Sequence, residues 1–139
     1  MLVIKELNIK CAEIYLFDSG IILLKYKSDY EIELKDVKEV EKVFLELIDE
    51  KGIFCLMDTS DRYYNITKEA QEFLSNEASI VKDKKIKGSA VVINNLPNRL
   101  LAQFFSKFFK PKFPMKIFST QEEGMVWLKE LIKKSSVSV

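Results

Sequence analysis

Two short apolar runs separated by helix-like segments constrain the fold of this 139-residue chain more than any other feature. Residues 53–57 are entirely apolar and residues 90–93 repeat the pattern, which is typical of strands buried on both faces of a sheet. Between and before them, residues 37–48 and 68–77 space their apolar side chains by three and four, as amphipathic helices do. Strands that alternate with helices are joined by right-handed crossovers. The sequence therefore predicts an α/β fold with a mostly parallel sheet.

The first part of the chain predicts an opening β-hairpin. Residues 13–17 and 21–27 have the composition of short strands, and the Asp-Ser-Gly sequence at 18–20 favours a tight turn between them. Residues 30–34 then alternate apolar and acidic side chains, which indicates a half-exposed edge strand whose acidic residues face water. A last short strand is predicted at 115–118. The expected sheet is therefore mixed, with a parallel majority.

About four helices are predicted, each supported by a residue suited to a helix N-terminus. Thr67 precedes the helix at 68–77 and is placed to cap it through the side-chain hydroxyl. Pro97 suits the first turn of the next helix, which runs to about residue 109. The first and last helices begin with the spacing of capping boxes. These boxes are Asp36 with Glu39 and Thr120 with Glu123.

The size and composition of the chain suit one domain with one substantial core. Of its residues, 47% are hydrophobic and 31% are charged, which excludes disordered and fibrous classes. We expect a single domain over residues 1–134 and a flexible tail over residues 135–139. The longest apolar stretch is much shorter than the roughly 18 residues that a membrane span needs. With no secretory signal at its start, we expect a cytoplasmic protein.

The absence of histidine removes much of the chemistry that enzymes use. The chain has no Ser-His-Asp triad, no Cys-His pair and no His-ligated zinc or haem site. Its two cysteines, Cys11 and Cys55, are far apart in sequence and lack metal-ligand spacing. Asp58 and Asp61 follow a buried strand, where a magnesium or phosphoryl site is conceivable, but we favour a loop held by side-chain hydrogen bonds. We therefore expect a non-enzymatic protein without catalytic residues, metal or cofactor.

Three segments of the chain carry a resemblance to a known family. They are Leu56-Met57-Asp58, Ile66-Thr67-Lys68-Glu69-Ala70 with Phe73, and Phe118-Ser119-Thr120-Gln121-Glu122-Glu123 before Trp127-Leu128. Together with the order of elements, they resemble the STAS domain, and more closely its SpoIIAA-like branch, which is grouped with lipid-binding CRAL-TRIO relatives. The resemblance spans nearly the whole chain and implies a SpoIIAA-like sandwich. Gly124 departs from it, because that branch usually has Ala before the apolar stripe of the final helix.

The resemblance implies regulation through protein contacts rather than catalysis. In the anti-sigma factor antagonists of the wider family, a partner kinase phosphorylates a Ser or Thr at the start of the second helix, and Thr67 lies nearest that position. The family motif is Asp-Ser-Ser-Gly, whereas this chain has Asn-Ile-Thr-Lys at 65–68. An ordinary N-cap is the alternative interpretation of Thr67. The implied partner surface, with Thr67 as its switch, comprises Asp58, Thr59, Ser60, Asp61 and Thr67.

The helix predicted after Pro97 has an unusually wide apolar face. Its apolar side chains span an arc of about 180°, whereas a helix lying on a sheet covers an apolar stripe of roughly 100–140°. Some of Leu100, Phe105 and Phe109 should therefore stay exposed unless another surface covers them. The candidate surface comprises Leu101, Phe104, Phe105, Phe108 and Phe109. Candidate contacts for anionic groups along its edge are Lys107, Lys110 and Lys112.

Two functions from different classes remain open. The first is a STAS-like interaction or regulatory module, whose partner is a protein such as a kinase, or a second copy in a homodimer. The alternative is a carrier of an apolar ligand such as an acyl chain, or a protein that binds anionic membrane surfaces through the phenylalanine-rich helix. Nucleic acid is the least favoured partner, because the isoelectric point of about 7.6 is low and no reading motif is present.

Overall fold

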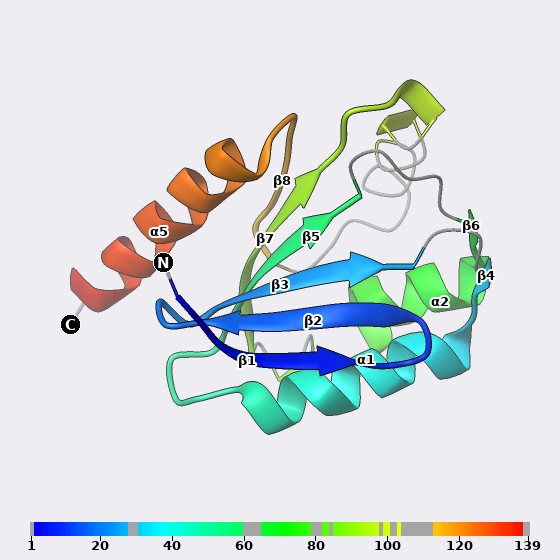
Figure 1. The fold of residues 1–139 in the computed structure, drawn as a ribbon, viewed down its shortest axis with the longest axis horizontal. Coiled ribbons are helices and arrows are strands. Elements are labelled where there is room, and N and C mark those ends of the chain that lie inside the picture. The colour runs from blue at the N-terminus through cyan, green and yellow to red at the C-terminus, as the bar shows by residue number, and fades with distance from the viewer. Residues whose placement is uncertain are drawn as a thin grey trace.

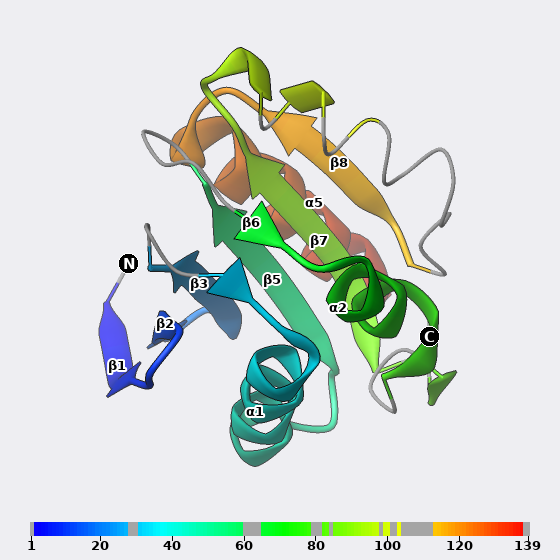
Figure 2. The ribbon, with the colours of Figure 1, turned by 90° about the vertical axis from the view of Figure 1, so that its right-hand side faces the viewer.

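A mixed six-stranded sheet forms the middle of three layers in the computed structural model (Figure 1). Helices α1 (Leu34–Leu47) and α2 (Lys68–Glu72) pack on one face of the sheet, and α5 (Gln121–Val137) packs on the other. Figure 2 shows this layering from the side on which α2 lies in front of the sheet and α5 behind it. The structure describes residues 2–27, 31–59, 65–78, 82–83, 85–97, 99–100, 103 and 113–137.

The main sheet combines an antiparallel meander with a parallel half. β1, β2 and β3 pair antiparallel, and β3, β5, β7 and β8 pair in parallel, in the order β1-β2-β3-β5-β7-β8. The predicted mixed, mostly parallel sheet is confirmed. Its strands are β1 (Val3–Asn8), β2 (Ala12–Phe17), β3 (Ile21–Tyr26), β5 (Ile53–Asp58), β7 (Ile86–Val92) and β8 (Met115–Phe118).

The opening hairpin is the β2–β3 pair, and its turn is the one predicted at 18–20. Gly20 has a φ of +88°, a conformation that L side chains rarely adopt and that glycine adopts without strain. The structure adds β1, which was not predicted, at the outer edge of the sheet beside β2. All but one of its six residues are exposed, so its sequence lacks the alternation that marks a half-buried strand.

The prediction for residues 30–39 was wrong in its boundaries. Among the described residues of this segment the strand is β4 (Glu31–Ile32), and it pairs with the equally short β6 (Asn65–Ile66) rather than with the main sheet. Helix α1 begins at Leu34 with Glu33 as its N-cap, and Asp36 Oδ2 accepts a hydrogen bond of 2.9 Å from the Glu33 backbone N–H. The capping box therefore joins Glu33 and Asp36, one turn earlier than the predicted pair of Asp36 and Glu39.

The remaining helices agree with the sequence in position but differ in detail. The predicted helix at 68–77 is α-helical only over α2 and continues as a π-helical turn, η1 (Phe73–Glu77). Residues 96–97 and 99–100 are helical, as expected around Pro97, whereas most of that predicted helix lies outside the described residues. The segment at 135–139, expected to be a flexible tail, is helical through Val137.

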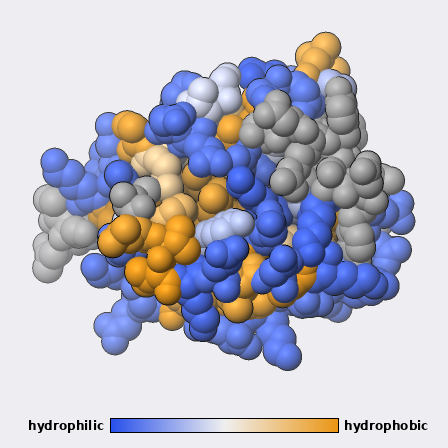
Figure 3. All heavy atoms as spheres, viewed as in Figure 1, coloured by the Kyte–Doolittle hydropathy of each residue, from blue (hydrophilic) through white to orange (hydrophobic). Residues whose placement is uncertain are grey.

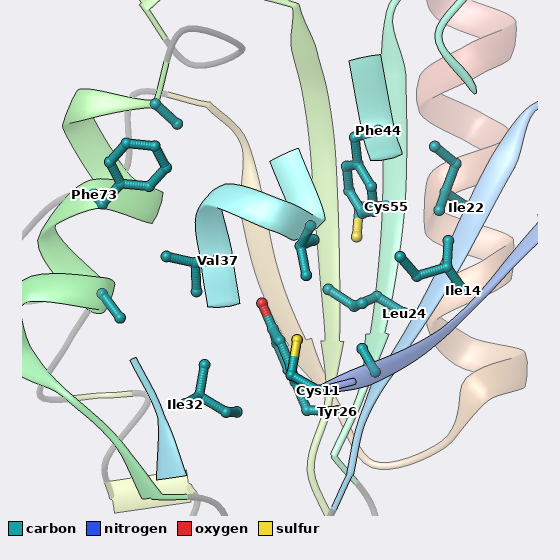
Figure 4. Close-up of a cluster of buried hydrophobic side chains, with 14 of the residues drawn as sticks. Cys11, Ile14, Ile22, Leu24, Tyr26, Ile32, Val37, Phe44, Cys55 and Phe73 are labelled. Atoms are coloured by element: carbon teal, nitrogen blue, oxygen red, sulfur yellow. The ribbon is translucent and has the colours of Figure 1, made fainter. Parts of the chain in front are cut away.

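Two hydrophobic clusters hold the three layers together. The larger lies between the sheet and helices α1 and α2, where Ile14, Leu24 and Cys55 meet Val37 and Phe44 (Figure 4). The smaller lies beneath α5 and is centred on Leu128. Alternate side chains of β5 enter both clusters, so this strand is buried on both faces, as the apolar run predicted.

Gly124 marks the closest approach of α5 to the sheet. A Cβ atom at this position would lie 2.8 Å from Leu56 Cδ1 and 3.3 Å from Ala90 Cβ, both in fully buried residues. The glycine lowers the helix propensity of α5 by about 1 kcal/mol relative to alanine. Close packing therefore explains why this position departs from the pattern of the family that the chain resembles.

We expect the substitution Gly124→Val to lower the free energy of unfolding by roughly 1–3 kcal/mol, because its side chain overpacks the contact with Leu56 and Ala90. Urea unfolding monitored by circular dichroism measures the effect. Val126→Ala, on the exposed side of the same helix, is the control and should change stability by no more than about 0.5 kcal/mol. Equal stability of Gly124→Val and the wild type would contradict this packing account.

Candidate functional site

The predicted polar residues at the end of β5 are buried and fixed by contacts across the sheet. Asp58 is 6% exposed, and its Oδ2 atom accepts a hydrogen bond from Nε2 of Gln121, the first residue of α5. Thr59 is equally buried and donates from its hydroxyl to the Val92 carbonyl oxygen at 2.8 Å. Both side chains thus connect the carboxyl end of β5 to neighbouring elements. The bond from Gln121 joins Asp58 to a distant side chain, whereas the sequence predicted bonds from Asp58 to the backbone of its own loop.

Arg99 brings a cation to the same edge of the sheet. Its Nη2 atom lies 3.5 Å from the Ile93 carbonyl oxygen and 3.5 Å from Ser119 Oγ, beyond the ends of β7 and β8. The sequence alone singled out neither Arg99 nor Gln121 as a candidate site residue. The available signal was positional, since each residue lies shortly after a predicted strand, at the edge where open α/β sheets place ligands.

Thr67 is the N-cap of α2, as predicted. Its Oγ1 atom accepts a hydrogen bond of 3.2 Å from the Ala70 backbone N–H. Its own backbone N–H donates to the Ile32 carbonyl oxygen at 3.0 Å, which links the start of α2 to β4. The residue is half-buried, and the helix that it caps, α2, lies in front of the sheet in Figure 2.

The rest of the predicted partner surface and the phenylalanine-rich surface fall outside the described residues. Ser60 and Asp61 belong to the first of these surfaces. The second has one described member of its wide apolar face, Leu100, which is 56% exposed, as expected for part of that face. The predicted residues outside the described ranges are Ser60, Asp61, Leu101, Phe104, Phe105, Lys107, Phe108, Phe109, Lys110 and Lys112.

The described ranges contain neither a cluster of metal-ligating side chains nor a helix that could span a membrane. No group of three or more His, Cys, Asp or Glu side chains in that part of the chain is arranged to hold a metal ion. Nor does any described helix combine the length and apolar character needed to cross a membrane.

Both cysteines are buried thiols with raised pKa values. Burial raises the pKa of Cys55 from 9.0 to about 12. Burial, with smaller contributions from the Asp36 and Glu39 carboxylates, raises the pKa of Cys11 to about 11. Since the thiolate is the reactive form, neither cysteine is a nucleophile near neutral pH.

We expect the native chain to resist alkylation by iodoacetamide near neutral pH, because both thiols are protonated and shielded from solvent. Intact-mass measurement over time reports the number of adducts. The same chain unfolded in urea provides the control and should take up one adduct at each of its two cysteines. Rapid labelling of the native protein at either cysteine would refute the assignment.

The fold of this chain has a counterpart among solved structures. It is similar to the crystal structure of an uncharacterized protein of the DUF3478 family with a SpoIIAA-like fold, from Shewanella loihica PV-4. The two share 13% sequence identity with a TM-score of 0.60, over 89% of this chain and 98% of that one. The chain therefore has a SpoIIAA-like fold, which confirms the resemblance seen in its sequence.

The family follows from the sequence itself. Residues 15–132 match the domain of unknown function DUF7793, and this chain is a member of that family. No curated protein matches the chain significantly.

Removing the cap on α2 should lower stability without altering the fold. We expect Thr67→Ala to lower the free energy of unfolding by about 1 kcal/mol, because the Ala70 N–H loses its acceptor. Thr67→Ser retains the hydroxyl and should recover most of the loss. Urea denaturation of the three proteins measures both effects, and a stability loss as large in the serine variant would show that the hydroxyl is not the cause.

Proposed function

We propose that this protein is a STAS-like interaction module with a regulatory role. Its partner, in this proposal, is another protein that binds the surface formed by the end of β5, the segment after it and the start of α2. The SpoIIAA-like fold supports a module of this class. The position of Thr67 is the observation that carries the proposal. This half-buried residue caps α2 with its hydroxyl, and its backbone N–H donates a hydrogen bond to Ile32 of β4.

A phosphate on Thr67 is the regulatory step that we propose. It would add nearly two negative charges at the start of α2, where backbone N–H groups favour an anion. Because the Thr67 backbone is bonded to Ile32, a change at this residue acts on β4 and β6 as well as on α2. Phosphorylation would therefore change both the charge and the local structure of the surface offered to a partner.

Binding rather than catalysis is supported by the chemistry of the described residues. Asp58 and Thr59 are occupied by contacts that hold the sheet and α5 together. Both thiols have raised pKa values, and the sequence contains no histidine. The alternative role as an apolar-ligand carrier depends on the phenylalanine-rich segment and stays a prediction from the sequence.

The proposed function can be tested by comparing the proteins captured by the wild type and by Thr67→Glu from the cells that produce the chain. We expect the glutamate variant to lose or gain a specific partner, because it places a lasting negative charge at the cap. Ser135→Glu adds the same charge on an exposed part of α5 and is the matched control. Thr67→Ala separates the loss of the cap from the added charge.

The same experiment includes a direct search for the modification. The denaturing mass of the wild-type chain purified from those cells, followed by peptide mapping, reports covalent phosphate at Thr67. Identical partners for the wild type and Thr67→Glu, together with an unmodified Thr67, would reject the switch.

A further inference from the structure

The start of β1 presents apolar side chains to solvent. Leu2, Val3 and Ile4 are consecutive in sequence and are 72%, 47% and 62% exposed, respectively. Figure 3 shows hydrophobic residues gathered on the surface over this end of β1. A run of exposed aliphatic residues on a folded domain favours an interaction surface, which we call the β1 patch.

The β1 patch belongs to an ordered part of the backbone. The Asp18 N–H donates to the Leu2 carbonyl oxygen at 2.8 Å, and the Leu2 N–H donates to Asp18 Oδ1 at 3.3 Å. Val3 pairs with Phe17 of β2, and the register then shifts around Ile4. These contacts fix the backbone that carries the exposed side chains before any partner binds, which lowers the backbone conformational entropy lost on association.

A partly open hollow of about 190 Å³ lies directly beside the β1 patch. It is found at the amino ends of β3 and β5, between the β2–β3 turn and the segment that joins α1 to β5. Ile4, Phe17, Ile48 and Ile132 form part of its apolar wall. Apolar cavities of about 150 Å³ accept a group the size of benzene, so this hollow is large enough for an aliphatic side chain.

We propose that the β1 patch and this hollow form a two-fold interface with a second copy of the chain. Leu2 of each copy, the most exposed residue of the patch, fills the hollow of the other copy. In a two-fold contact the same patch of each copy faces the other, so a patch that carries both a protruding side chain and a hollow offers each copy a hollow for the side chain of its partner. The interface lies at the opposite end of the parallel strands from Thr67, so it leaves the proposed partner surface free.

The charges around the hollow also favour a second copy. Its rim holds the exposed carboxylates of Asp18 and Asp49 together with the exposed ammonium group of Lys51. A rim with both signs allows Lys51 of one copy to face a carboxylate of the other, whereas a rim of one sign would repel its own copy. An anionic lipid surface suits this rim less well, because the two carboxylates outnumber the lysine.

Sedimentation velocity over a dilution series tests the interface, with any affinity tag placed after Val139 so that Leu2 is unobstructed. We expect a dimer for the wild type, and a dissociation constant raised roughly tenfold or more for Leu2→Asp and for Ile4→Asp. Leu96→Asp, at the other end of the sheet and 65% exposed, should leave the dimer intact. Circular dichroism and urea unfolding confirm that each variant is folded.

Two results would overturn the proposal. The first is a wild-type chain that stays monomeric throughout the series. The second is a dimer that survives both Leu2→Asp and Ile4→Asp, which would place the contact elsewhere on the molecule. Because Leu2 is largely exposed, its substitution also keeps the test valid if Ile4→Asp does not fold.

Discussion

The burial of β5 on both faces is the constraint on which the rest of the structure depends. Its side chains alternate between the two hydrophobic clusters, with Cys55 on the α1 side and Phe54 and Leu56 on the α5 side. A strand of this kind is stable only when both faces are covered, because each exposed apolar side chain would forfeit roughly 1.5–3 kcal/mol of burial free energy. One layer of helices is therefore not enough to cover β5. The close packing of α5 on the sheet at Gly124 follows from the same requirement.

The sequence was most informative where the structure depends on neighbouring residues, as in a run of buried apolar side chains or a helix cap. The apolar runs predicted β5 and β7, and the side-chain oxygen of Thr67 predicted the start of α2, because both signals depend on neighbouring residues. The edge strand β1 escaped prediction because its residues are mostly exposed and its pairing with β2 supplies the order. Helix α1 begins early for a similar reason, since Asp36 is buried and bonds to Glu33 instead of acting as the cap itself.

The candidate site was predictable in composition but not in connectivity. Asp58 and Thr59 were identified from their place after a buried strand, yet their partners come from elsewhere in the chain. Asp58 meets Gln121 across 63 positions and Thr59 meets Val92 across 33, and no local pattern encodes contacts of that range. Polar residues at the ends of parallel strands therefore serve here to join the layers, which leaves the half-buried Thr67 as the group nearer to solvent.

The hydrogen bond between Asp58 of β5 and Gln121 of α5 forms only when α5 docks on the sheet, and this docking comes late in the folding of the chain. The β1–β2–β3 meander needs only short turns, so the loop-closure entropy of its pairing is small. Helix α5 packs on residues of β5, β7 and β8. It can therefore dock only after β7 and β8 have joined β5 through their longer crossover connections. A nascent chain leaving the ribosome would therefore complete its second hydrophobic layer last, and until then the α5 face of β5 is the surface most exposed to aggregation.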